Sequence, residues 1–191
     1  MKRSLFTAIL IIAFANPASA ELSSEQQSAK VRGIILYNQY KAVSATPFLT
    51  IAAEAGDHEA QYYLGEAIRK NKRYIDTAAK DAYEASANQG NIYSMIRLGQ
   101  MEGDLCATMN NCSKSQKPPK EWLASAKSLA AKEAAQGNAE SMYLMYEITG
   151  NKKWLEQSAE NGYALSQYLL ATDYREGGGF FLLPSSRADA V

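Results

Sequence analysis

Few side chains in this chain combine the type and spacing that catalysis requires. The single histidine, His58, lies between Asp57 and Glu59. An imidazole oriented by a carboxylate can act as a general base, but the same three residues also suit a solvated first helical turn, which we favour. The signatures of serine hydrolases, zinc peptidases and phosphate-binding loops do not occur in the sequence. We therefore assign no catalytic residue and expect a protein that is not an enzyme.

The chain contains two cysteines, Cys106 and Cys112. In an exported protein, one such pair predicts a disulfide, and two free thiols are the alternative. A zinc site would need more ligands than two thiolates, and the only histidine, His58, is distant in sequence. We expect a disulfide between these cysteines, and neither a metal nor a cofactor.

The first twenty residues have the three parts of a secretory signal peptide. Lys2 and Arg3 precede an apolar run from Leu5 to Phe14, and the small residues Ala18 and Ala20 follow with one residue between them. The apolar run is about half the roughly 20 residues that span a bilayer. The pattern predicts export to the periplasm, with no membrane insertion after cleavage.

The charge composition argues against two classes of partner. The chain has 20 Lys and Arg and 20 Asp and Glu, so removal of Lys2 and Arg3 leaves 18 against 20, a net charge of about −2. Nucleic-acid binding favours a basic surface, and binding to a membrane surface favours a polybasic segment. The sequence has neither feature, so we expect no nucleic acid and no membrane surface as partner.

Tyrosine is the residue type that points to binding, since the chain contains twelve. Tyrosine offers a large contact area at low entropic cost and is enriched in binding hot spots. We predict Tyr63, Tyr93 and Tyr146 as partner-binding residues, the first and last because they adjoin the expected core residues Leu64 and Met145. The alternative is that the tyrosines fill the space between helices, with their hydroxyls at its edge.

The elements that would position these side chains follow from a short sequence motif, or phrase, that recurs four times. Each copy has an alanine, a glycine three residues later, a small residue four after the glycine, and leucine or methionine four further on. The first two copies end with a second glycine. The residues that define the repeats are Ala53, Gly56, Leu64, Gly65, Ala87, Gly90, Leu98, Gly99, Ala134, Gly137, Ala159 and Gly162. Agreement over several positions favours an internal repeat over coincidence.

The repeated phrase has a physical interpretation. A glycine just past a helix end supplies a left-handed turn, and small residues on either side allow two helices to approach closely. A helical hairpin of this kind cannot bury its own apolar face, so successive hairpins must stack. No segment alternates like a strand. The predicted fold is all-α: an α-solenoid of about four stacked antiparallel helix hairpins.

The phrase resembles the repeats of the Sel-one-like repeat (SLR) family, which is related to the tetratricopeptide repeats. The resemblance covers residues 47–191, and only the first two copies carry the complete Leu-Gly ending. The first glycines of the copies are 34, 47 and 25 residues apart, whereas the family period is in the mid-thirties. We therefore expect an insertion in the second interval, between Gly90 and Gly137, and a shortened last hairpin.

The resemblance implies a protein-binding function. Exported members of this family include immunity proteins that neutralise antibacterial effectors in the periplasm, and adaptors of envelope or signalling complexes. Cysteine-rich members bind or slowly hydrolyse β-lactams, but they carry a disulfide in nearly every repeat, whereas this chain has one cysteine pair. We expect a periplasmic, non-enzymatic protein–protein interaction module whose partner is another protein, with an immunity protein as one form of that function.

The repeats and their flanks set the expected boundaries. Ser24 and Gln27 are expected to form a capping box at the first helix, and Pro47 to start the second. The last repeat is expected to be incomplete, either because the chain is truncated or because a partner covers its apolar residues. The expected segments are a signal peptide at 1–20, a single domain at 21–191, an N-terminal capping helix within 21–46, an inserted surface loop at 104–119 and an incomplete last repeat at 177–191.

Export can be tested directly. The mature protein should fractionate with the periplasm and begin at Glu21, because signal peptidase accepts the small residues at Ala18 and Ala20. N-terminal sequencing of the fractionated protein checks this. Full-length protein that keeps Met1 and remains in the cytoplasm would contradict the interpretation.

Overall fold

The computed structural model describes residues 21–175, so the predicted signal peptide and the predicted incomplete repeat at 177–191 lie outside the described residues. Within 21–175 every regular element is helical. No helix in this range has the length and apolar character needed to cross a bilayer. The elements are α1 (Ser24–Asn38), α2 (Ala42–Glu54), α3 (His58–Lys72), α4 (Thr77–Asn88), α5 (Ile92–Gly99), the 3-10 turn η1 (Met101–Gly103), α6 (Leu105–Thr108), α7 (Pro119–Ala134), α8 (Ala139–Thr149), α9 (Lys152–Glu160) and α10 (Ala164–Arg175).

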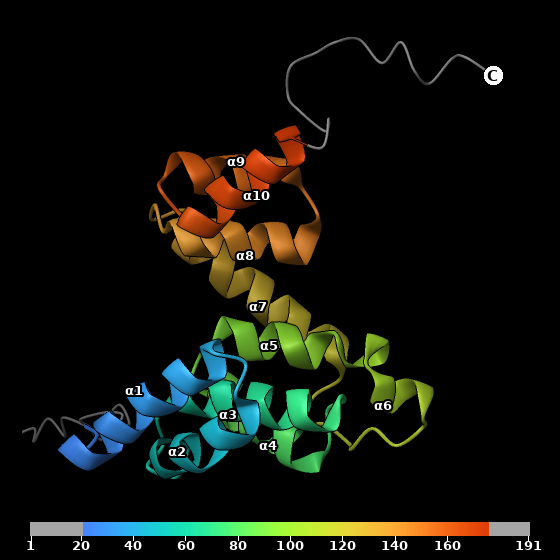
Figure 1. Ribbon diagram of the computed structural model, residues 1–191. Helices are drawn as coiled ribbons and strands as arrows, with labels where there is room; N and C mark the ends of the chain where they lie inside the picture. Colours follow the sequence, from blue (N-terminus) through green and yellow to red (C-terminus); the bar gives the residue numbers. More distant parts are fainter. Residues whose placement is uncertain (1–20, 176–191) are drawn as a thin grey trace, which may run out of the picture.

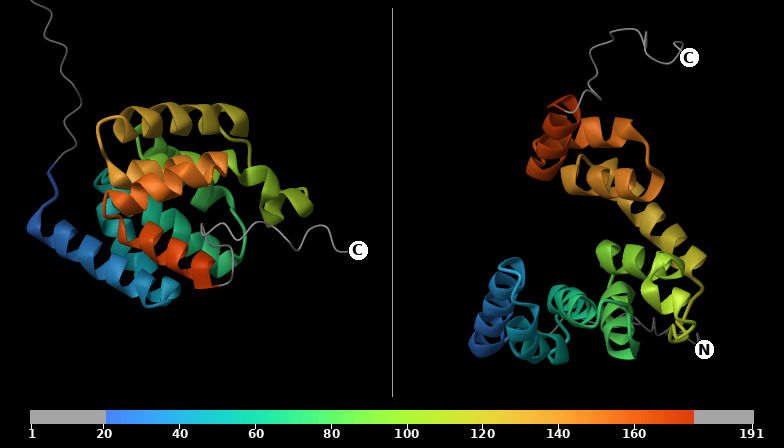
Figure 2. Two further views of the ribbon diagram at one scale, coloured as in Figure 1. Left: turned by 90° about the horizontal axis from the view of Figure 1, so that it is seen from above. Right: turned by 45° about the vertical axis from the view of Figure 1, so that its right-hand side comes forward.

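The helices form a stack in which each long helix packs on the next along the chain. Helices α1, α3, α5, α8 and α10 make one layer, which we call the inner layer, and α2, α4, α7 and α9 make the outer layer. Within the inner layer α1 also contacts α3, and α5 also contacts α8. The stack bends into an arc between α1 and α10 (Figures 1 and 2). This arrangement is that of an α-solenoid, as the repeated phrase predicted.

The four repeat glycines end the outer helices in the same way. Their φ angles are 91° at Gly56, 93° at Gly90, 89° at Gly137 and 89° at Gly162. Each glycine N–H donates to the carbonyl three residues earlier, and the next N–H donates to the carbonyl five residues earlier. This pair of bonds is the Schellman motif. The predicted left-handed conformation is therefore present at all four turns.

The residue after the glycine caps the following inner helix in three of the four turns. Asp57, Asn91 and Asn138 each accept, through a side-chain oxygen, the backbone N–H three residues later. An oxygen in this position satisfies an N–H group that the helix leaves unpaired. The turn is thus defined on both sides by sequence, which explains its regularity.

Two serines at equivalent positions join successive repeats. Ser86 Oγ donates to the carbonyl of His58 at 2.6 Å, and Ser158 Oγ donates to the carbonyl of Ala139 at 2.6 Å. Each serine lies four residues before a repeat glycine, and each carbonyl belongs to the first residue of the preceding inner helix. The periodicity of the sequence therefore reappears as a periodicity of contacts.

Small residues set the distance between the layers. The positions four residues after the glycines, Ala60, Ser94, Ser141 and Ser166, are all buried. Further along, a Cβ added to Gly65 would lie 2.7 Å from the Tyr83 ring, and one added to Gly99 would lie 2.3 Å from Leu123. The second glycine of the phrase thus provides space for a side chain of the next outer helix.

The structure corrects the expected start of the second helix. Helix α2 begins at Ala42, so Pro47 lies inside it and the predicted boundary at residue 46 is wrong. The bond that Pro47 cannot donate would reach the carbonyl of Val43, a residue that is 74% exposed. The preceding turn uses Tyr40 at φ 61°, with the same two backbone bonds as the glycine turns. Because this turn has no glycine, the repeat pattern did not predict it.

Two smaller expectations also change. The capping box of α1 uses Ser23 and Gln26, one residue before the predicted Ser24 and Gln27, because Ser23 is the residue with extended backbone before the helix. The insertion at 104–119 is not a simple loop, since it contains α6. Asp104 caps that helix by accepting the N–H of Cys106.

The close contact at Gly65 gives a stability prediction. Gly65→Ala should destabilise the protein by about 1–2 kcal/mol, because overpacking costs about 1–3 kcal/mol and the gain in helix propensity returns at most about 1 kcal/mol. Urea unfolding measures the difference. Gly103→Ala is the matched control, since a Cβ there meets nothing within 4 Å, and it should change stability by less than about 0.5 kcal/mol. Equal stability of the two variants would contradict the packing argument.

Candidate functional site

The inner layer of the stack carries a cavity of about 440 Å³. Its lining comes from α1, α3, α5 and α8 and from the residues just before α5 and α10. We call this cavity the tyrosine groove. It is lined by Tyr37, Asn38, His58, Glu59, Tyr62, Tyr63, Asn91, Tyr93, Glu140 and Tyr163.

Tyrosine rings form a continuous run along the N-terminal half of the groove. The ring centroids of Tyr37 on α1 and Tyr63 on α3 are 5.3 Å apart in an edge-to-face arrangement. Tyr62 lies 5.2 Å from Tyr63 and 5.5 Å from Tyr93 on α5. These separations are within the favoured range for aromatic pairs. Three inner helices are therefore joined by side chains that face one cavity.

The run continues through hydroxyl groups to the C-terminal half. The Tyr93 hydroxyl donates to Glu140 Oε1 at 2.6 Å and lies 3.3 Å from the hydroxyl of Tyr163. Tyr163 packs on Tyr143 of α8 at 5.4 Å between centroids, and Tyr143 lies 6.3 Å from Tyr146. The aromatic surface thus extends beyond the cavity itself, from α1 to α8.

Two carboxylates lie in the groove. Glu59 at the start of α3 shares Lys30 with Asp57, each oxygen being 2.8 Å from Lys30 Nζ. Glu140 accepts the bond from Tyr93, and burial together with that bond raises the pKa of Tyr93. The phenol therefore stays protonated and acts as a donor.

A buried carboxylate lies beneath the groove. Glu66 on α3 is 2% exposed. Its Oε1 accepts bonds from the Tyr83 hydroxyl at 2.8 Å and from Arg97 Nε at 2.6 Å, and its Oε2 accepts a bond from the Tyr37 hydroxyl at 3.0 Å. Arg69 approaches Oε2 at 3.4 Å. Four helices, α1, α3, α4 and α5, supply these groups, which we call the Glu66 network.

The Glu66 network holds its carboxylate in the ionised form. Burial alone would raise the pKa of Glu66, but the charges of Arg97 and Arg69 and the bond from Tyr83 outweigh it, so the pKa lies below its usual value. Burial opposes the charge of Arg97 as well, yet Glu66 raises the pKa of that guanidinium. Each charge in the network therefore depends on the other.

The structure brings two of the three predicted partner-binding tyrosines together. Tyr63 and Tyr93 both line the tyrosine groove and are half-buried. Tyr146 lies outside the cavity lining, and its ring packs against that of Tyr143. Tyr63 does not stand free, since it packs edge-on against Tyr37. Tyr63 therefore combines features of both alternatives: its ring packs between helices, and it also faces the groove.

His58 is the first residue of α3 and lines the same groove beside Glu59. Its backbone carbonyl accepts the bond from Ser86 described above. The groove-lining residues of the described chain include no serine, threonine or cysteine that an imidazole could activate. Within residues 21–175, no three His, Cys, Asp or Glu residues gather as they would around a metal ion.

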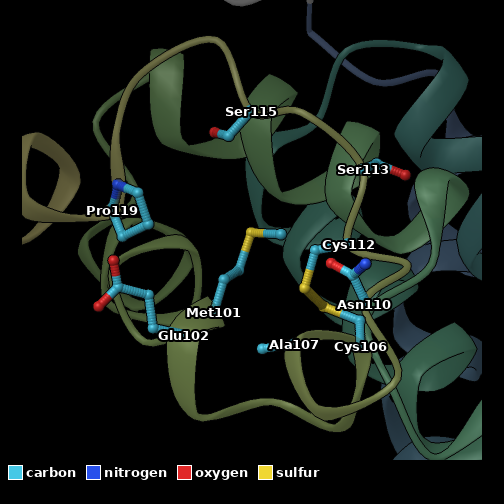
Figure 3. A pocket seen from close by; sticks show the side chains of 9 residues that line it. All are labelled: Met101, Glu102, Cys106, Ala107, Asn110, Cys112, Ser113, Ser115 and Pro119. Atoms are coloured by element: carbon cyan, nitrogen blue, oxygen red, sulfur yellow. A yellow bond between two sulfur atoms is a disulfide. The ribbon is translucent and has the colours of Figure 1, made fainter.

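A second cavity, of about 350 Å³, lies beside the insertion. Cys106 and Cys112 form the disulfide, with an S–S length of 1.98 Å. Figure 3 shows Met101 in the middle of this cavity, with the disulfide on one side and Pro119 on the other. No histidine and no pair of carboxylates lines it, so it offers less chemistry than the tyrosine groove.

A second buried carboxylate, on α4, holds the insertion against the stack. Glu84 on α4 accepts bonds from Ser115 Oγ and from the N–H of Gln116, both at 2.6 Å. Ser115 Oγ also accepts the indole N–H of Trp122 at 3.0 Å. The segment after the disulfide is therefore held against α4 and α7, which makes its role structural.

The Glu66 network is the feature that sequence reasoning missed. A glutamate in a helix is usually solvated, and nothing in the repeat pattern marks this one. One signal could have found it: Glu66 lies four residues after Tyr62, so the two share a helix face, and Tyr62 holds a position, six residues after a repeat glycine, that is tyrosine or isoleucine in all four copies. The arginine partner, Arg97, is 31 residues away in sequence, so its contact required the fold.

Neither a model of a known protein family nor a curated protein matches this chain. The tyrosine groove and the Glu66 network are therefore the features from which function is argued. Both belong to the inner layer of the stack.

Loss of the Glu66 charge should be costly. Glu66→Gln should lower the free energy of unfolding at pH 7 by about 3 kcal/mol, because Arg97 and Arg69 lose their counter-charge; part of Arg97 is exposed, which keeps the cost at the low end for a broken buried pair. Chemical unfolding measures this. Glu160→Gln, an exposed change on α9, should have an effect below about 0.5 kcal/mol.

The pH dependence of stability tests the same charge. Because folding lowers the pKa of Glu66, its contribution is complete above the unfolded value of about 4.3 and is lost as the pH falls through the lower folded value. The stability difference between wild type and Glu66→Gln should therefore shrink as the pH is lowered from about 5 towards 3. A difference that stays constant over this range would mean that Glu66 is not ionised in the fold.

Proposed function

We propose that this protein is an exported, non-enzymatic α-solenoid of the SLR type that binds another protein in its tyrosine groove. The observation that carries the proposal is the run of tyrosine rings from α1 through α3 to α5 along one cavity. Such a surface offers several aromatic anchors at fixed positions. Aromatic anchors in a preformed site supply most of the affinity in many protein interfaces.

The repeat type is supported by the regular turns. Four Schellman turns with left-handed glycines, three of them followed by a capping Asp or Asn, recur at the positions where the sequence resembles SLR repeats. A stack with such turns presents its inner helices as one extended surface. Export is supported by the Cys106–Cys112 disulfide, which suits an oxidising compartment.

The residues of the groove are better suited to binding a protein than to catalysing a reaction. The described groove residues supply hydroxyls, amides and carboxylates, which suit recognition, but no nucleophile beside His58. The single disulfide lies in the insertion, outside the groove lining, so the arrangement gives no support to a β-lactam-hydrolysing function. An immunity protein that covers a periplasmic effector, or an adaptor of an envelope complex, would each use the groove in this way.

Two alanine substitutions test the binding function. Tyr63→Ala and Tyr93→Ala should each weaken partner binding by about 1–3 kcal/mol, because each removes a half-buried anchor from the groove. Affinity capture from an envelope extract, followed by mass spectrometry, identifies the partner, and titration with that partner measures the loss. Tyr146→Ala should have a smaller effect, since Tyr146 does not line the cavity.

Tyr168→Ala is the matched control, because Tyr168 is a tyrosine of α10 that is 65% exposed and lies outside the groove lining. Its binding should equal that of wild type. Circular dichroism of every variant separates loss of binding from loss of fold. The proposal fails if a captured partner binds the Tyr63 and Tyr93 variants as tightly as it binds wild type and Tyr168→Ala.

A further inference from the structure

The tyrosine groove has a negative charge balance. Its lining contains the carboxylates of Glu59 and Glu140 and no lysine or arginine. Glu59 shares the single cation Lys30 with Asp57, so these three groups together keep one net negative charge. Glu140 receives only the neutral phenol of Tyr93 and forms no ion pair with a lysine or arginine of residues 21–175.

The rings between these carboxylates are suited to a cation. Tyr63 lies within the electrostatic influence of both, since burial and then the charges of Glu59 and Glu140 raise its pKa. At the edge of the groove the protein already pairs a cation with a ring, because Lys70 Nζ lies 4.0 Å from the ring centroid of Tyr37. A cation over a tyrosine face is attracted by the ring quadrupole, and more strongly when water is excluded.

The nature of the occupant follows from what covering the groove would cost. An apolar segment laid over Glu140 would take an unpaired carboxylate out of water, which is expensive. An acidic segment or a nucleic acid would add repulsion from both carboxylates. A basic side chain would instead pair with the carboxylate while its stem packs on the rings.

We infer that the groove receives a lysine or arginine side chain of a protein partner, held between Glu59 and Glu140 over the rings of Tyr63 and Tyr93. The inference rests on the proposed protein-binding function and specifies the chemistry of the partner. A guanidinium suits the site particularly well, because it stacks on an aromatic face and can also donate to a carboxylate.

Selection from a random heptapeptide display library tests the inference with a defined probe. The baits are the mature chain and two variants of it: Glu59→Gln with Glu140→Gln, which keeps the side-chain shape and removes both charges, and the exposed control Glu160→Gln. Peptides enriched on the wild type and on the control should carry lysine or arginine, and this preference should disappear on the double variant. An enriched basic peptide should bind the double variant about tenfold more weakly or worse, and its affinity for the wild type should fall with added salt.

Two results would overturn the inference. Selected peptides that show no preference for lysine or arginine would do so, as would a basic peptide that binds the double variant as tightly as the wild type. If uncharged peptides bind the wild type and lose affinity with Tyr63→Ala, the inference fails while the proposed function stands. If no peptide is enriched on any bait, the inference fails, and capture of the natural partner then decides the proposed function.

Discussion

The arrangement of the inner layer depends on one buried carboxylate. In a stack of hairpins each helix normally contacts only its neighbours, so nothing in the repeat pattern fixes α1 relative to α5. Glu66 removes this freedom, because its two oxygens take donors from α1, α3, α4 and α5 at once. An ionised carboxylate with 2% exposure would be too costly without these partners. The network therefore favours one relative placement of the four helices.

The tyrosine groove follows from that placement. Tyr37 donates to Glu66 and packs on Tyr63, so the same residue joins the network to the groove wall. Tyr62 lies between the Tyr83 ring of the network and the Tyr93 ring of the groove, at 6.3 and 5.5 Å. Side chains that are already ordered lose less entropy when a partner arrives, and this raises affinity without adding contacts. The buried charge thus orders the surface to which we propose that a partner binds.

The sequence predicted those parts of the fold that depend on local backbone chemistry. Glycine marks a left-handed turn because other residues adopt it at a cost, so Gly56 and Gly90 located their turns correctly. The turn at Tyr40 has the same bonds but a residue that rarely takes this conformation, and it was missed together with the start of α2. Pro47 was expected at a helix start, where proline is favoured, but it lies inside α2, four residues after the exposed Val43.

The candidate site was predicted in part. Tyr63 and Tyr146 were predicted because each adjoins an expected core residue, yet Tyr63 lines the cavity and Tyr146, seven residues after the first residue of α8, does not. The contact between Glu66 and Arg97 could not be predicted, because it joins two repeats whose relative placement the sequence does not state. Local rules therefore gave the turns and the layers, and long-range charge pairing decided the site.

The most direct test of this account is amide hydrogen exchange, measured by mass spectrometry on the wild type and on Glu66→Gln under conditions where both are folded. The network joins four helices, so loss of the charge should reduce protection in α1, α4 and α5 as well as in α3, while α9 and α10 keep theirs. A loss of protection confined to α3, or no loss at all, would contradict the claim that Glu66 orders the inner layer.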